Sequence, residues 1–201
     1  MRKFVPAYEG NLRKHALSVP RCISECSGIR VFGRRIKSLV FSTDVAIIKN
    51  INADAIIAVY PFTPQPAITQ AIIGVSEVPV FCGVGGGLTN GVRSASMAAY
   101  VEHQGAYGVV CNSKIGVETI HAIKDAVEIP VVYTVISENT DIQPYLTAGV
   151  DIINVSGAAR TPEIVGALRQ RYPELPIIAT GGPTEESILA TIRAGANAIT
   201  Y

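Results

Sequence analysis

Three glycine-rich segments each follow a short apolar run and precede a stretch long enough to form a helix. Such a loop can bind an anion, because its backbone N–H groups and the positive end of the helix dipole favour negative charge. The segments therefore predict a phosphate site, unless their glycines only turn the chain tightly. Neither the P-loop nor the Rossmann spacing is present. The candidate ligand-binding residues are Gly85, Gly86 and Gly87 in the first segment, Ser156 and Gly157 in the second, and Thr180, Gly181 and Gly182 in the third.

Arg160 is the charged residue that best fits such an anion site. It lies in the second glycine-rich segment, and a guanidinium can bind phosphate or carboxylate through two parallel hydrogen bonds. The alternative is an ordinary surface ion pair. Glu185 and Glu186 come in the first helical turn after the third segment, where they would repel an anion unless they point outward.

Asn154 is the most informative polar residue near the end of a predicted strand. Ile57 and Val110 occupy the corresponding positions in two other strands, so a barrel that needed only packing would place an apolar residue there. A buried asparagine must be hydrogen-bonded, either to its neighbours or to a ligand. The segment 60–66, rich in proline and aromatic residues, forms either one wall of a pocket or a bare connection.

Acid–base or covalent chemistry would fall to Asp44, Lys114 and Glu138. These residues follow the first, fourth and fifth predicted strands. Lys114 would form a Schiff base if it were buried and deprotonated, and otherwise it is solvated. Asp44 follows Ser42 and Thr43, and its alternative role is to cap the first helix.

The histidines and cysteines do not form a recognisable site. The cysteines lack the paired spacing of a zinc site, and reduced thiols are the expected state. Two histidines fall within or at the far end of predicted helices and are expected to point away from the site, and the third lies in the basic N-terminal segment, so none of the three is expected to be catalytic. No metal and no cofactor is implied. These residues are His15, His103, His121, Cys22, Cys26, Cys82 and Cys111.

Internal repeats indicate the architecture that must position these residues. The phrase Glu-x-Pro-x occurs at 77–80, 128–131 and 174–177, and each copy opens a short apolar run. A second phrase, with glycine or asparagine before an apolar run, alternates with the first. The two interleave at the length of two βα units. The repeats therefore predict an α/β fold of the (β/α)8 TIM-barrel type, with an open doubly wound sheet as the alternative.

Eight apolar runs supply the strands, and helix-length segments separate them. The expected helices include residues 91–104, 115–127, 162–171 and 184–194. No eighth helix follows the last strand, so its flank needs a cover: the segment 11–26, a second copy in a homo-oligomer, or a further C-terminal stretch. The expected strands are residues 38–41, 55–60, 80–83, 108–111, 131–135, 152–155, 177–180 and 198–201.

Composition and charge limit the class of protein. The 201 residues are 48% hydrophobic and 16% charged, which suffices for a large core. No apolar run is long enough to span a membrane, and no secretory signal is found, so a cytoplasmic location is expected. Residues 1–37 hold nine Lys and Arg and two Glu and form a predicted basic extension, which packs on the barrel of residues 38–201. No nucleic-acid-binding motif accompanies this charge.

The segments 178–182 and 194–198 resemble the phosphate-binding (β/α)8-barrel superfamily, which includes isomerases, lyases, synthases and flavin-dependent oxidoreductases. The resemblance implies that Gly181 and Gly182 form the phosphate loop after the seventh strand. The sequence ends before the loop after the eighth strand that usually completes the phosphate site.

A closer resemblance, over almost the whole chain, is to an uncharacterised bacterial barrel family often labelled hydrolase. It is carried by the segments 59–66, 81–87 and 180–187. Two functions follow from these observations. One is a lyase, isomerase or hydrolase acting on a small phosphorylated or anionic metabolite. The other is a barrel that senses a ligand or has a structural role, without turnover.

Overall fold

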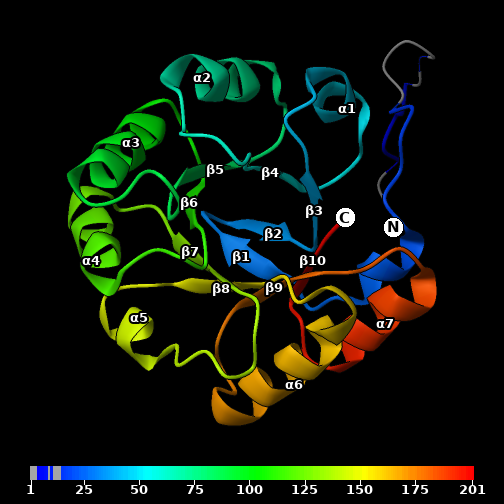
Figure 1. Cartoon of the computed structure of the whole chain (residues 1–201). Coiled ribbons are helices and arrows are strands. Elements are labelled where there is room, and N and C mark those ends of the chain that lie inside the picture. Colours follow the sequence, from blue (N-terminus) through cyan, green and yellow to red (C-terminus); the bar gives the residue numbers. More distant parts are fainter. Residues whose placement is uncertain (1–3, 9, 11–14) are drawn as a thin grey trace.

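A computed structural model describes residues 4–8, 10 and 15–201. Eight parallel strands form a closed barrel in the order β10-β3-β4-β5-β6-β7-β8-β9, and helices surround them (Figure 1). The predicted (β/α)8 barrel is thereby confirmed. Its strands are β3 (Ser38–Phe41), β4 (Ala55–Ala58), β5 (Val80–Gly85), β6 (Gly108–Cys111), β7 (Val131–Val135), β8 (Ile152–Val155), β9 (Ile177–Thr180) and β10 (Ala198–Thr200).

The helices connect successive strands on the outside of the barrel. The four helices expected at 91–104, 115–127, 162–171 and 184–194 run close to these ranges, and the last residue of the given sequence directly follows β10. The helices are α1 (Val45–Asn50), α2 (Pro66–Val75), α3 (Val92–His103), α4 (Val117–Ala126), α5 (Gln143–Thr147), α6 (Thr161–Arg171) and α7 (Glu185–Arg193), with the 3-10 helices η2 (Arg21–Glu25) and η3 (Ala158–Arg160).

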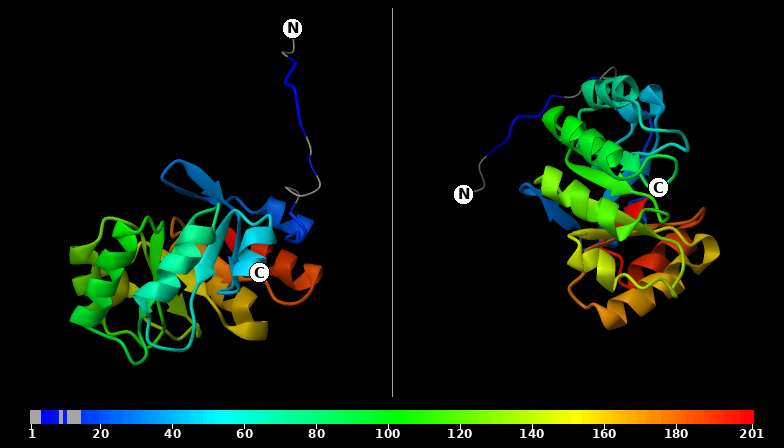
Figure 2. Two further views of the ribbon diagram at one scale, coloured as in Figure 1. Left: turned by 90° about the horizontal axis from the view of Figure 1, so that it is seen from above. Right: turned by 60° about the vertical axis from the view of Figure 1, so that its left-hand side comes forward.

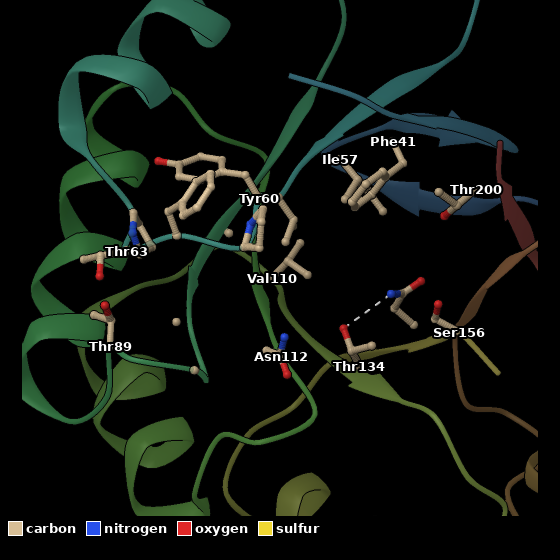
Figure 3. Close-up of a pocket in the computed structure, with 18 of the residues that line it drawn as sticks. Phe41, Ile57, Tyr60, Thr63, Thr89, Val110, Asn112, Thr134, Ser156 and Thr200 are labelled. Carbon is tan, nitrogen blue, oxygen red and sulfur yellow. Dashed lines mark hydrogen bonds between the residues drawn. The ribbon is translucent and has the colours of Figure 1, made fainter. Parts of the chain in front are cut away.

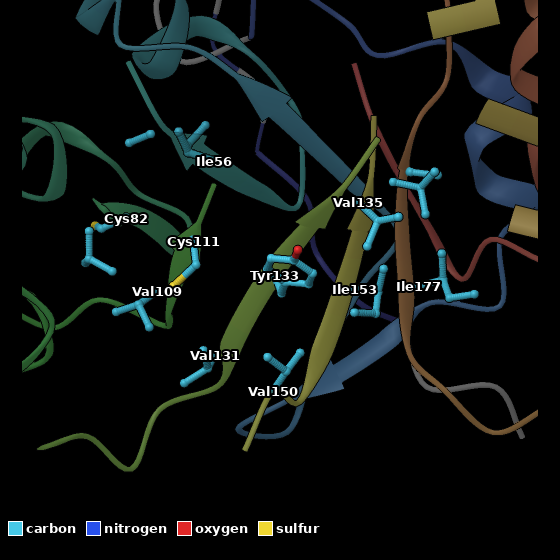
Figure 4. Close-up of a cluster of buried hydrophobic side chains, with 14 of the residues drawn as sticks. Ile56, Cys82, Val109, Cys111, Val131, Tyr133, Val135, Val150, Ile153 and Ile177 are labelled. Carbon is cyan, nitrogen blue, oxygen red and sulfur yellow. The ribbon is translucent and has the colours of Figure 1, made fainter. Parts of the chain in front are cut away.

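Alternate residues of each strand face opposite sides, so the apolar strands supply two cores. Outward residues pack against the helices, as Figure 4 shows for Cys82, Val109 and Tyr133. Inward residues fill the barrel. Following the strand registers around the barrel places Leu39, Phe81, Val132 and Ile178 in one layer from alternate strands, as expected for this fold. All four of these side chains are buried.

A hairpin closes the amino-terminal end of the barrel. Strands β1 (Ile29–Val31) and β2 (Arg34–Ile36) pair antiparallel, and they cross the middle of the barrel in the view of Figure 1. Val31 and Ile36 are buried and join the interior core. Figure 2 shows the hairpin projecting from one end of the barrel. The barrel interior is therefore sealed at this end, which leaves the opposite end as the place for a ligand.

The N-terminal segment also lies on the flank that has no eighth helix. Leu17 forms a bridge with Ile51, directly after α1, and η2 packs against α7. Ile23 of η2 is fully buried in the helix-side core. The described part of the proposed cover, residues 15–26, thus runs between α1 and α7, while residues 11–14 lie outside the described residues.

Basic side chains of the hairpin region contact carbonyl oxygens and an aromatic ring at the same end of the barrel. Arg35 donates to the carbonyl oxygen of Ser27, and Lys37 donates to that of Ser24. The Arg34 guanidinium lies 5.7 Å from the ring centre of Tyr107. Within the part of the chain that the structure describes, no helix is long and apolar enough to cross a membrane.

Candidate functional site

A cavity of about 560 Å³ lies at the carboxyl ends of the barrel strands (Figure 3). Its size is within the usual range for a small-molecule site. The described residues that line it include no Asp, Glu, Lys, Arg or His. They are Phe41, Ile57, Val59, Tyr60, Pro61, Phe62, Thr63, Pro64, Gly83, Gly85, Gly87, Leu88, Thr89, Val110, Asn112, Thr134, Asn154, Ser156, Thr180, Thr200 and Tyr201.

The floor of the cavity is one layer of four inward side chains. The strand registers place Ile57, Val110, Asn154 and Thr200 at the same level, from β4, β6, β8 and β10. We call these four residues the floor layer. Two of them are apolar and two are polar. The floor therefore offers apolar contact on one side and hydrogen bonds on the other.

Both polar residues of the floor layer keep a buried atom without a partner. Asn154 donates from Nδ2 to Thr134 Oγ1 at 3.3 Å, while its Oδ1 has no hydrogen-bond partner. Thr200 is only 6% exposed, and its hydroxyl also has no partner. An unpaired buried polar group costs about 1–3 kcal/mol. Both oxygens are covered by neighbouring atoms, so the two groups lower the stability of the protein as it stands.

The adjacent layer, which lies closer to the carboxyl ends of the strands, lacks one side chain, and this gap widens the cavity. It consists of Phe41, Gly83, Thr134 and Thr180, from β3, β5, β7 and β9. Gly83 has no side chain, and a Cβ there would lie 3.2 Å from Val59. The hydroxyls of Thr134 and Thr180 continue the polar side of the floor, while Phe41 continues its apolar side.

The loop after β4 forms an aromatic and proline-rich wall of the cavity. Residues 60–64 all line it, and the Tyr60 hydroxyl accepts a hydrogen bond from the Gln65 backbone N–H. Phe62 is 72% exposed and Leu88, in the loop after β5, is 88% exposed. Exposed apolar residues at the rim of a cavity are typical of a binding site.

The first glycine-rich loop borders the cavity through Gly85 and Gly87. Gly86 has φ +106°, and a Cβ there would lie 2.8 Å from Asn112, so both its conformation and its packing require glycine. The Gly86 N–H is bonded to the Thr89 carbonyl. In the described structure the N–H groups of residues 87–90, just before α3, have no acceptor.

The second glycine-rich loop contributes only Ser156 to the cavity lining. The Gly157 N–H donates to Thr161 Oγ1, and a Cβ on Gly157 would lie 2.4 Å from Ile164. Arg160 pairs with Glu138 and with Glu163, and its side chain is 58% exposed. Arg160 therefore forms the surface ion pairs that were the alternative to anion binding.

The third glycine-rich loop contributes Thr180 to the cavity, but its two glycines do not line it. The Gly181 N–H is bonded to the Thr200 carbonyl, and a Cβ there would lie 2.7 Å from Ile199. Thr184 and Ser187 form a capping box that binds backbone N–H groups at the start of α7. The anion donors expected at this helix are thus partly used within the chain.

The three catalytic candidates lie outside the cavity lining. The Asp44 carboxylate accepts from the N–H groups of Ala46 and Ile47 and caps α1, as its alternative role requires. Lys114 is exposed. Glu138 is paired with Arg160. The structure does not bring these three residues together with the cavity's polar groups, so it offers no acid–base pair there.

The Glu138–Arg160 pair should make a pH-dependent contribution to stability. The pKa of Glu138 is lowered because its own backbone N–H and Arg160 stabilise the carboxylate. A lowered pKa means that the stabilisation is fully present above the ordinary pKa of glutamate and is lost as the pH falls through the lowered pKa of the folded state. We expect Glu138→Gln to lower the melting temperature slightly at pH 7 and to have a smaller effect at pH 3. A difference as large at pH 3 as at pH 7 would contradict this assignment.

The cysteines are not positioned for covalent catalysis. Cys82 and Cys111 point to the helix-side core, and burial raises the pKa of each thiol to about 12. A thiol with such a pKa is not a nucleophile at neutral pH. Among the residues that the structure describes, no three His, Cys, Asp or Glu side chains gather as they would around a metal ion.

The barrel and its cavity define a (β/α)8 protein with a ligand-sized site at the usual end. No family model matches the sequence, and no curated protein matches it. Among solved structures, a protein described as a phosphonomutase from Burkholderia cenocepacia J2315 has a TM-score of 0.67 and 17% identity, covering 89% of this chain and 88% of that chain.

Two further solved barrels are similar in fold. A 2,3-dimethylmalate lyase of the PEP mutase/isocitrate lyase superfamily has a TM-score of 0.68 and 14% identity, covering 90% of this chain and 75% of its own. A phosphonopyruvate hydrolase, solved with oxalate and Mg²⁺, has a TM-score of 0.64 and 16% identity, covering 83% and 75%. The comparisons support the barrel fold, whereas the phosphate-binding superfamily and the hydrolase label stay predictions.

Proposed function

We propose that this protein binds a small, uncharged and partly apolar organic molecule in the cavity at the mouth of the barrel. The observation that carries the proposal is the lining: it contains hydroxyls, amides and apolar groups, and no charged side chain among the described residues. A dianionic ligand would find no counter-charge there. A neutral ligand would form hydrogen bonds with hydroxyls and amides of the lining and bury its apolar part against Ile57 and Val110.

On this proposal the protein is a ligand-binding barrel whose site selects its ligand by hydrogen bonding and shape. The described lining has two tyrosines, Tyr60 and Tyr201, but no Asp, Glu, His, Lys or Cys, which favours binding over proton-transfer chemistry. The fold similarity to lyases and a hydrolase does not alter this, because one barrel fold hosts many unrelated functions.

The second candidate is an enzyme that acts on a phosphorylated or carboxylate metabolite. The observation that favours it is the row of N–H groups without acceptors at residues 87–90 of the described structure, of which Gly87, Leu88 and Thr89 line the cavity shortly before α3. Backbone N–H groups and the helix dipole could hold an anionic group at that edge. Arg160, Gly181 and Gly182, which were expected to bind the phosphate, would then stand apart from it.

A thermal-shift screen distinguishes these candidates. The library would contain neutral amides, ketones and alcohols together with phosphates, phosphonates and carboxylates of similar size. A ligand at 100 times its dissociation constant stabilises by about 2.7 kcal/mol. We expect the shifts to come from neutral members. Shifts confined to the anionic members would support the second candidate, and no shift with any member would contradict both.

Val110→Phe should abolish these shifts. The added ring would project from the floor layer into the cavity and occupy the space of the ligand. Val92→Phe is the matched control, because Val92 is 79% exposed on α3 and does not line the cavity. Stabilisation that survives Val110→Phe in a folded sample would place the binding site elsewhere.

A further inference from the structure

We propose that the side-chain N–H groups of Asn112 select the ligand, and that the ligand carries a neutral oxygen acceptor such as the carbonyl of a ketone, ester or amide. This inference rests on the proposed function, and it specifies the chemical class of the ligand. It follows from the orientation of the Asn112 side chain. Asn112 lines the cavity and is exposed, so a ligand in the cavity can reach it.

The backbone of Asn112 is held in place at the end of β6. Its N–H donates to the Gly85 carbonyl oxygen at 2.9 Å, and its own carbonyl oxygen accepts from the Ile115 N–H at 3.1 Å. Asn112 directly follows β6 and lies two positions after Val110, so both side chains face the cavity. The side chain therefore starts from a fixed point above the floor layer.

Two hydrogen bonds also determine which way the Asn112 amide points. Its Oδ1 accepts from the Lys114 backbone N–H and from the Ser113 hydroxyl, both at 3.2 Å. A backbone N–H can only donate, so the amide oxygen is the atom that must lie on that side. Nδ2 lies on the side of Val110 in Figure 3, and it has no acceptor among the described residues.

Asn112 therefore presents donors, and no acceptor, to the cavity. The hydroxyls of Thr134, Ser156 and Thr180 in the same lining can rotate to donate or to accept, so they do not discriminate between the two kinds of ligand group. An apolar ligand atom or a donor against Asn112 would displace water from its N–H groups without replacing the hydrogen bond. An acceptor at this position replaces it.

The position of Asn112 fits an acceptor that is attached to an apolar body. Two residues along a strand span roughly 6.6 Å, so the amide lies about the length of a small aromatic ring above Val110. A ligand whose apolar part rests on the floor layer would reach Asn112 with a carbonyl oxygen. No described residue of the lining is cationic, so a neutral acceptor is favoured over a carboxylate or a phosphate.

Three matched probes test this inference: acetophenone, α-methylstyrene and benzoate. They share a phenyl ring and nearly the same shape, but they present a ketone oxygen, no acceptor, and an anionic acceptor. The measured quantity is the Kd of α-methylstyrene divided by the Kd of acetophenone, from NMR titrations. Comparing this ratio between protein variants cancels the different hydrophobicities of the two probes.

Asn112→Asp should lower the ratio about tenfold. The carboxylate keeps one oxygen for the Lys114 N–H and the Ser113 hydroxyl, but its second oxygen replaces the N–H groups and repels the ketone. Asn139→Asp is the matched control. It makes the same change of charge at an exposed residue outside the cavity lining, so the ratio should remain as it is.

The Asn112 side-chain amide protons of the unsubstituted protein give a second readout, which does not depend on the folding of any variant. They should shift downfield with acetophenone and not with α-methylstyrene, because only the ketone accepts a hydrogen bond from them. An equal response to both probes would overturn the inference, as would an unchanged ratio in folded Asn112→Asp.

The remaining outcomes separate this inference from the proposed function. Benzoate binding more tightly than acetophenone would overturn the neutral class of ligand and support the second candidate function. Failure of acetophenone to bind would overturn the inference as well, and the library screen with Val110→Phe would then decide the proposed function independently.

Discussion

Phe81→Ala should lower the free energy of unfolding by about 3–5 kcal/mol, and Gly108→Ala by about 1–3 kcal/mol. Phe81 is 1% exposed and lies inside the barrel, where its register partner on the next strand is Gly108. A Cβ on Gly108 would lie 2.5 Å from the Phe81 ring. The Phe81 ring therefore occupies the space that a side chain at position 108 would need.

The double variant measures this coupling. Once the ring is removed, the closest remaining neighbour of an alanine Cβ at 108 is the Pro130 carbonyl oxygen at 3.1 Å, so Gly108→Ala should destabilise the Phe81→Ala protein much less than it destabilises the unsubstituted one. Urea unfolding of the four proteins gives the coupling free energy. Destabilisations that simply add would show that Gly108 has another role, such as a backbone conformation that alanine cannot adopt.

Thr200→Val should raise the free energy of unfolding by about 1 kcal/mol. The Thr200 hydroxyl is buried without a partner, so an apolar side chain of the same shape removes an unsatisfied group. The gain should appear as a higher urea midpoint with an unchanged slope.

Thr191→Val is the matched control. Thr191 is as buried as Thr200, at 1% and 6% exposure, but its hydroxyl donates to the Ser187 carbonyl. Thr191→Val removes this hydrogen bond and should therefore destabilise the protein. Equal destabilisation by both substitutions would contradict this account, because it would show that the Thr200 hydroxyl already has a stabilising contact.

The barrel could be predicted from sequence because its signals are local and repeated. The phrases before the strands recur at regular spacing, and the apolar runs that follow match β5, β7 and β9 closely. Asn154 stood out for the same reason: its register equivalents Ile57 and Val110 are apolar. Its place at the cavity floor agrees with the interpretation that such an asparagine needs a partner.

The features that could not be predicted from the sequence depend on contacts between residues that are distant in the chain. Arg160 pairs with Glu138, 22 positions away, and no local pattern reveals that the two side chains meet. The closing hairpin was not foreseen, although Val31 and Ile36 alternate with arginines around a turn. The sequence analysis also did not identify Thr200 as a residue of the cavity floor. The available signal was its position two residues after Ala198, which points into the barrel, because alternate residues of a strand face the same side.

The central claim is that the ligand binds at the floor layer of the barrel mouth, and an NMR titration of the backbone and Asn154 side-chain amides tests it most directly. A neutral compound that stabilises the protein in the thermal-shift screen would be added to ¹⁵N-labelled protein. We predict the largest shift changes at Ile57, Val110, Asn154 and Thr200, including the Asn154 side-chain amide. Changes centred instead on Gly157, Gly181 and Gly182 would contradict the account and return the site to the glycine-rich loops after β8 and β9.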